Sequence, residues 1–142
     1  MAEQHTIQVD IVSAEGEIFS GPATMVFAPA SEGDLGIAPR HAPLLTLLKA
    51  GEVRVQTTDG KEQSFFVGGG ALEVQPNKVT VLADTAMRAH DIDEAAALAA
   101  KQRAEEALRD KSGRISEAEA LAELSRAAAM LKMVEKIRKL RG

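Results

Sequence analysis

The chain of 142 residues contains no cysteine, no tryptophan and no tyrosine, and its four phenylalanines are its whole aromatic content. Without cysteine there is no disulfide, no thiolate metal site and no cysteine nucleophile. An aromatic fraction of 3% argues against nucleic-acid modules that stack bases on aromatic side chains. The net charge of −4 also disfavours contact with a phosphate backbone. We therefore expect no nucleic-acid partner.

Long hydrophobic runs are absent as well. No apolar stretch approaches the ~20 residues needed to span a bilayer, and the first residues show no basic region followed by an apolar core, as a signal peptide would. We expect a soluble, cytoplasmic protein that meets a membrane only through a complex. Hydrophobic residues make up 45% of the chain, which is enough for one ordinary domain or two small ones.

Apolar and polar residues alternate in the first part of the chain. Ile7, Val9 and Ile11 alternate with Gln8 and Asp10, and the same period of two returns around residues 53 and 79. Alternation places one face of a strand in a core and the other in water. Many short strands with frequent turns predict an antiparallel β-sandwich or small barrel over residues 1–85.

Glycines mark two features of this predicted β domain. Asp59-Gly60 between two strand-like runs predicts a hairpin with a type I′ turn, in which both central residues have φ > 0. Residues 68–70 are all glycine. A phosphate-binding loop would need a helix after them, but a strand-like run follows, so a bulge or tight turn is expected instead.

Helical patterns replace this alternation over residues 86–142. Asp91 with Glu94, and Ser116 with Glu119, predict two capping boxes, with a turn at residues 111–114 between the helices. The pattern predicts an antiparallel two-helix hairpin with alanines on its first helix. Such an interface buries few CH₂ groups, each worth ~0.8 kcal/mol. Two interpretations stay open: a permanently packed hairpin, or one that opens or docks elsewhere.

Charge divides along the same boundary. Residues 1–85 carry a net charge of −6, and residues 86–142 carry a net charge of +2. The last turns are basic, with Lys132, Lys136, Arg138, Lys139 and Arg141. Cations at a helix C-terminus match its dipole. They are consistent either with a solvated face or with docking onto an acidic protein surface.

The most distinctive segment spans residues 31–45. Its acidic start, Ser31 to Asp34, leads into a stretch turned by Gly33, Gly36, Pro39 and Pro43, and then into a leucine run. Glycine permits φ > 0 and proline fixes φ. The segment therefore presents carboxylates on a rigid base, which suits a docking contact at least as well as catalysis.

Catalytic and metal-binding patterns are not found. No pair among His5, His41 and His90 has the i, i+4 spacing of a helical metal site. No serine has a nucleophile-elbow context, and nothing selects a carboxylate pair. We predict no catalytic residue, no metal site and no cofactor. Three classes stay open at this point: a subunit of a larger machine, a free-standing interaction module, and a small hydrolase with a site assembled from distant residues.

Five segments together resemble one family: residues 10–15, 19–21, 31–45, 69–76 and 79–84. In sequence and order they resemble the epsilon subunit of bacterial F-type ATP synthase, over essentially the whole chain. The resemblance implies a β-sandwich of residues 1–85 that docks on the rotor and a regulatory α-helical hairpin of residues 86–142. It also implies a peripheral protein on the cytoplasmic face of the bacterial inner membrane.

The resemblance further implies a non-catalytic central-stalk subunit of a proton-driven ATP synthase. In that family the subunit couples the gamma subunit to the c-ring. Its helices inhibit ATP hydrolysis by extending toward the alpha/beta catalytic hexamer. The matching positions imply contact of Ser31, Glu32 and Asp34 with the c-ring, and a place for His41 near gamma.

Some members of that family bind ATP on the folded hairpin. Their motif matches Asp93 and Ala97 here, but Ala96 replaces its arginine, and Met87 stands where those members carry glutamate. Arg103 and Arg126 are the remaining candidates for contact with a phosphate of ATP. Because alanine cannot make the bidentate bonds that arginine makes, we expect weak ATP binding or none.

Overall fold

The structure is a computed structural model that describes residues 5–110 and 116–141, the side chain of residue 141 excepted. The chain divides into two compact units, Met1–Arg88 and Ala89–Gly142. We expected the division three residues earlier, after residue 85. The short strand β7 (Ala86–Arg88) accounts for the difference, because it pairs antiparallel with β5 and so belongs to the β unit.

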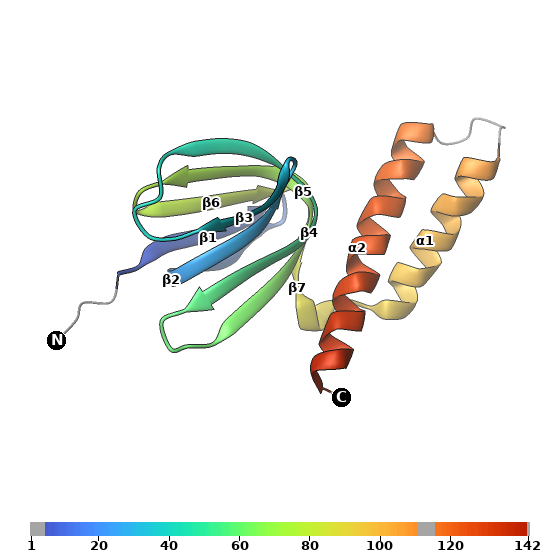
Figure 1. Ribbon diagram of the computed structural model, residues 1–142. Helices are drawn as coiled ribbons and strands as arrows, with labels where there is room; N and C mark the ends of the chain where they lie inside the picture. The colour runs from blue at the N-terminus through green and yellow to red at the C-terminus, as the bar shows by residue number, and fades with distance from the viewer. Residues whose placement is uncertain (1–4, 111–115, 142) are drawn as a thin grey trace. The chain divides into compact units, whose positions relative to one another are not determined.

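Six further strands build the β unit (Figure 1). They are β1 (Ile7–Ser13), β2 (Gly16–Ala30), β3 (Gly33–Ile37), β4 (Leu44–Thr57), β5 (Glu62–Gln75) and β6 (Lys78–Ala83). Their hydrogen-bonded order is β1-β6-β5-β4-β2-β3, and β2 also pairs with β1. This extra pairing closes a ring of five strands, so the predicted β-sandwich is confirmed in a closed, barrel-like form.

One pairing departs from the expected antiparallel pattern. Strands β1 and β6 run parallel, with Val9 opposite Val79 and Ile11 opposite Val81. These four residues are fully buried, with 0% exposure. The periodicity of two identified the strands and their inward faces. It carries no information on strand direction, because alternation is the same in parallel and antiparallel pairs.

Buried residues from β1 to β6 form one hydrophobic core inside this ring. Its largest fully buried members include Phe65, Ile7, Ile11, Ile37 and Leu72. Among the described residues no charged or polar residue is buried, and no buried side-chain nitrogen or oxygen lacks a hydrogen-bond partner. The interior of the β unit is therefore an apolar core.

The glycine tripeptide lies inside β5, where that strand changes neighbours. Gly69 and Gly70 have φ of 107° and 138°. A Cβ on Gly70 would lie 2.1 Å from the carbonyl oxygen of Leu82. Before this point β5 pairs with β7, and after it with β6. The glycines thus let the strand bend against its neighbour, and the strand that follows excludes a phosphate-binding loop.

The predicted hairpin at Asp59-Gly60 exists, but its turn differs from expectation. Strand β4 ends at Thr57 and β5 begins at Glu62, so the connection is longer than two residues. Only Gly60 has positive φ there, at 82°. The Asp59 carboxylate accepts hydrogen bonds from the Thr57 hydroxyl and the Lys61 amide. These contacts stabilise a wider turn than type I′, and they lower the pKa of Asp59.

The second unit begins with a 3₁₀ turn, η1 (Ala89–Asp91), and contains α1 (Glu94–Arg109) and α2 (Glu117–Arg141). The two helices pack side by side and antiparallel (Figure 1), so the predicted hairpin is confirmed. Their buried residues are Ala97, Ala104, Ala120, Ala127 and Met133. The predicted turn at residues 111–114 lies outside the described residues.

Candidate functional site

The acidic segment forms the tip of the β2–β3 hairpin. Ser31 and Glu32 make the turn, and Gly33, with φ of 139°, begins β3. Ser31, Glu32 and Asp34 are all exposed. Gly36 was expected to help turn the chain but lies within β3. A Cβ there would meet Met25 Cε at 3.0 Å and Phe27 Cε1 at 3.3 Å, so its small size leaves room for neighbouring side chains.

His41 lies in the connection from β3 to β4. Its amide donates to the Ala38 carbonyl at 3.2 Å, and its Nδ1 lies 2.7 Å from the Ala42 carbonyl oxygen. A carbonyl only accepts, so Nδ1 carries the hydrogen. The preceding residue, Arg40, has φ of 68°, and its amide donates to the Pro76 carbonyl at 2.7 Å. The bond from Arg40 fastens the connection to the β5–β6 hairpin, and the two His41 contacts lie within the connection itself.

The acidic tip lies at the start of β3, and His41 lies beyond its end. Asp34 is the second residue of that strand, and His41 comes four residues after its last residue, Ile37. Five strand residues span about 16 Å at ~3.3 Å per residue. The structure therefore does not bring His41 and the acidic residues into one cluster. They lie at two separate places on the β unit.

Between these two places runs an apolar patch of three exposed leucines and one half-buried alanine, which we define as Leu45, Leu47, Ala71 and Leu82. Leu45 is 73% exposed, Leu47 67% and Leu82 51%. Leu47 on β4 faces Ala71 on β5, which faces Leu82 on β6. The row crosses three strands on their outer face. Folding does not require leucine at an exposed strand position, and a contiguous exposed apolar row is typical of protein contact surfaces.

A shallow pocket of about 440 Å³ adjoins the apolar patch. It is lined by Leu47, Leu48, Gly69, Gly70, Ala71, Leu82 and Asp84. Sequence reasoning identified the leucine run at residues 44–48 but missed Leu82 and the pocket. These residues become neighbours through strand pairing, and one sequence read alone carries no pairing register.

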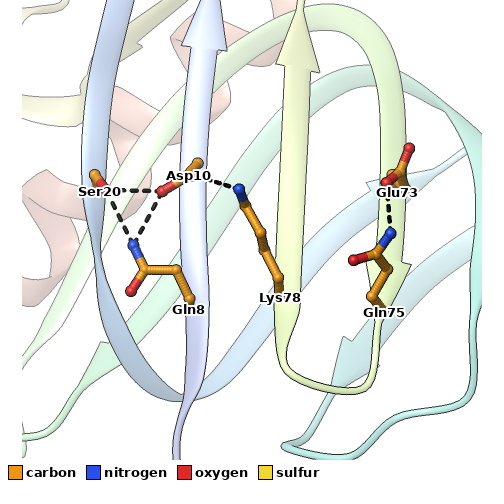
Figure 2. Close-up of polar contacts among 6 residues, drawn as sticks. All are labelled: Gln8, Asp10, Ser20, Glu73, Gln75 and Lys78. Atoms are coloured by element: carbon orange, nitrogen blue, oxygen red, sulfur yellow. Dashed lines mark hydrogen bonds and ion pairs between the residues drawn. The ribbon is translucent and has the colours of Figure 1, made fainter.

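A polar network occupies the outer surface of β1, β2 and β6 (Figure 2). One Asp10 carboxylate oxygen accepts from the Ser20 hydroxyl at 2.7 Å and from Gln8 Nε2 at 3.1 Å. The other lies 3.2 Å from the Lys78 ammonium. The bonds from Ser20 and Gln8, with the charge of Lys78, hold the pKa of Asp10 below its usual value of 3.8.

This network links strands and has no catalytic arrangement. Asp10 is tied to β2 through Ser20 and to β6 through Lys78, while Glu73 accepts from Gln75 within β5 at 3.1 Å (Figure 2). A carboxylate held ionised by three partners is a poor general acid or base at neutral pH. Nor does the described part of the chain hold a cluster of histidine or acidic residues that fits a metal ion.

The helical unit corrects one predicted helix start. Asp93, not Asp91, is the N-cap of α1, and its carboxylate accepts from the Ala96 amide at 3.1 Å. Asp91 belongs to the 3₁₀ turn before it. Aspartate stands at both positions. The prediction chose Asp91 because Glu94 follows it at the capping-box spacing, and this choice was wrong. At the second helix, Ser116 accepts from the Glu119 amide at 3.1 Å, as expected.

The three residues named for a nucleotide are distributed over both helices of the hairpin. Asp93 is occupied as a helix cap. Arg103 lies ten residues along α1, about 15 Å away at 1.5 Å per residue. Arg103 is exposed and Arg126, on α2, is half-buried.

No helix among the described residues is long and apolar enough to cross a membrane.

Two family models of known proteins match this chain, one for each structural unit. Residues 6–89 match the family model described as "ATP synthase, Delta/Epsilon chain, beta-sandwich domain". Residues 90–135 match "ATP synthase, Delta/Epsilon chain, long alpha-helix domain". The two matches meet within two residues of the division between the structural units.

Two curated relatives cover nearly the whole chain. An ATP synthase epsilon chain of Nitrosococcus oceani is 64% identical over 137 residues, which are 96% of this chain and 98% of that protein. Its counterpart in Halorhodospira halophila is 60% identical over 136 residues, covering 94% of this chain and 96% of that protein.

Solved structures share the fold at low sequence identity. A chain of the Euglena gracilis mitochondrial ATP synthase (OSCP/F1/c-ring) has a TM-score of 0.72 at 20% identity, over 93% of this chain and 81% of that one. A chain of the Tetrahymena thermophila mitochondrial ATP synthase (central stalk/c-ring) has a TM-score of 0.56 at 14% identity, over 92% and 98%. With both domains matched and two relatives at 60% identity or more, the chain belongs to the family of ATP synthase delta/epsilon chains.

Proposed function

We propose that this chain is the central-stalk epsilon subunit of a bacterial, proton-driven F-type ATP synthase, and that it has no catalytic residue of its own. It acts as a peripheral subunit on the cytoplasmic face of the inner membrane. The observation that carries the proposal is the outer surface of the β unit. There an acidic hairpin tip, a row of exposed leucines and a histidine-bearing turn follow one another.

The β unit is assigned to rotor docking. Ser31, Glu32 and Asp34 contact the c-ring, and His41 lies against the gamma subunit. Their separation by the length of β3 supports two partners rather than one. The apolar patch supports a permanent protein interface. Covering it would stabilise a complex by about 25 cal/mol for each Å² of apolar surface removed from water.

The helical unit is assigned to regulation of ATP hydrolysis at the alpha/beta hexamer. Four of the five buried residues that the structure describes in this unit are alanine, so few large side chains are fully buried between the two helices. A weakly held hairpin is suited to alternate between a packed and an extended form. The basic end of α2 supports docking onto an acidic surface, and its residues Arg138 and Lys139 are exposed.

ATP binding by the hairpin is weak or absent in this proposal. Asp93 already accepts a hydrogen bond as the N-cap, and Ala96 offers no side-chain donor where ATP-binding members have arginine. Isothermal titration calorimetry of the purified chain with ATP tests this directly. Micromolar affinity would refute this part of the proposal.

A truncation tests the regulatory role. A chain ending at Asp91 keeps every strand of the β unit and lacks both helices. Membranes carrying it should show higher ATPase activity than wild type, with the truncated subunit still co-purifying with the complex. Unchanged ATPase activity in an assembled complex would contradict an inhibitory hairpin, and loss of co-purification would contradict docking through the β unit.

A further inference from the structure

The open end of the helical hairpin is closed by an ion pair between its two helices. Glu94 is the first residue of α1, and Arg138 lies in the last turn of α2. A guanidinium nitrogen of Arg138 donates to Oε2 of Glu94, so the contact joins residues 44 positions apart. It lies at the end of the hairpin opposite the helix connection.

Each partner is also favoured by its own helix. The N-terminus of α1 carries a positive partial charge that stabilises Glu94. The C-terminus of α2 carries a negative one that stabilises Arg138. An antiparallel arrangement puts these two ends together. The pair therefore matches the charge of both helix ends at the one place where they meet.

The apolar contacts near this pair are small. Along α1 the buried residues are Ala97 and Ala104, and along α2 they are Ala120, Ala127 and Met133. A buried methyl group contributes far less than a buried leucine side chain. Val134 and Ile137 near this end are only half-buried, so the ion pair adds a direct polar link between the two helices at the open end.

We propose that Glu94 and Arg138 form a clasp, by which we mean this ion pair, that sets how readily the hairpin opens from its free end. The regulatory meaning of the clasp rests on the proposed function of the hairpin. The side chains of Glu94 and Arg138 are 47% and 66% exposed. Salt therefore reaches the clasp and weakens it, because exposed charges are screened over ~8 Å at physiological ionic strength.

A double-mutant cycle on the purified full-length chain tests the clasp. Glu94→Gln, Arg138→Gln and the double variant are compared with wild type by amide hydrogen exchange. Each single variant should accelerate exchange about two- to five-fold in the first turns of α1 and the last turns of α2. Exchange near Arg109 and Glu117 should change less. The double variant should exchange more slowly than the product of the two single effects predicts, because the ion pair is lost only once while each helix end loses its own charge separately.

A matched control separates the clasp from a general effect of charge. Glu135→Gln removes an ion pair with Lys139 that lies within α2 and is also solvent-exposed. It should leave exchange in the first turn of α1 at the wild-type rate. Raising salt from 0.05 to 0.5 M should accelerate exchange at the free end in wild type and much less in the Gln variants.

Several results would overturn the clasp. They are single-variant effects that multiply in the double variant, the same α1 acceleration from Glu135→Gln, or wild-type exchange in all variants. Membrane ATPase assays separate the clasp from the regulatory proposal. If the clasp variants open faster in exchange but leave ATPase activity unchanged while the truncation after Asp91 raises it, the clasp exists without controlling hydrolysis. If the truncation also has no effect, the regulatory proposal fails and the exchange result stands alone.

Discussion

The amide of Ser31 donates a hydrogen bond to the carbonyl of Leu47 at 2.8 Å. This bond ties the acidic tip of the β2–β3 hairpin to the strand that carries the exposed leucines. It makes the carboxylates and the apolar patch neighbours on one surface, although Ser31 and Leu47 are sixteen positions apart in the sequence. A partner that covers the leucines also meets the acidic tip.

The apolar patch should contribute to binding and little to folding. Leu47→Ser removes a side chain that is 67% exposed, so the free energy of unfolding should change by less than about 0.5 kcal/mol. Co-purification with the ATP synthase should weaken, because the interface loses apolar surface. Leu47→Met keeps that surface and serves as the matched control. A Leu47→Ser chain that binds like wild type would contradict the interface.

Charge at the acidic tip should govern coupling. Asp34→Lys places a cation where the proposed ring contact has a carboxylate. Proton pumping driven by ATP hydrolysis should fall in membranes that carry it. Because Asp34 is exposed, the purified variant should melt like wild type. Glu15→Lys makes the same charge change in the exposed β1–β2 turn and should pump normally. Normal pumping by Asp34→Lys would count against the ring contact.

Gly70 should tolerate no side chain. Gly70→Ala combines a φ of 138° with a Cβ placed 2.1 Å from the Leu82 carbonyl oxygen. The expected loss exceeds about 3 kcal/mol, measured by denaturant unfolding. Gly16→Ala is the control, since its φ is 130° but nothing lies within 4 Å of its Cβ. It isolates the backbone strain, which costs about 1–3 kcal/mol. Equal losses in the two variants would exclude the clash at Gly70.

The Asp10 network should make stability depend on acid. The pKa of Asp10 is lowered in the folded state by Ser20, Gln8 and Lys78. Its stabilisation is therefore fully present above the unfolded pKa near 3.8 and is lost as pH falls through the lower folded value. Asp10→Asn should melt below wild type at pH 7, and the gap should shrink below pH 4. A gap that stays constant between pH 7 and pH 2 would contradict the lowered pKa.

The N-cap assignment has a direct test. Asp93→Ala removes the acceptor for the Ala96 amide and should destabilise α1 by about 1 kcal/mol, seen as faster amide exchange in its first turn. Asp91→Ala alters the 3₁₀ turn before the helix and should have a much smaller effect there. A larger effect of Asp91→Ala than of Asp93→Ala on exchange in this turn would identify Asp91 as the N-cap instead.

Sequence patterns predicted those features that depend on interactions between residues close together in the chain. The alternation around Ile7 predicted strands whose inward residues are buried, because a pleat sends successive side chains to opposite faces. Ser116 was recognised as a cap because its hydroxyl needs only a nearby amide. The Asp59 turn was predicted in place but not in type, since its carboxylate bonds to Thr57 and Lys61 select a wider loop.

By itself the sequence determined the two kinds of secondary structure, the absence of any cysteine site, and the acidic segment followed by leucines. Composition and periodicity suffice for these. Only the tertiary structure decided that β1 and β6 pair in parallel, that Leu47, Ala71 and Leu82 share one row, and that Glu94 meets Arg138. Each of these depends on register between distant segments. Register is chosen by the packing of the whole unit, because a shift of one residue along a strand turns every side chain to the other face.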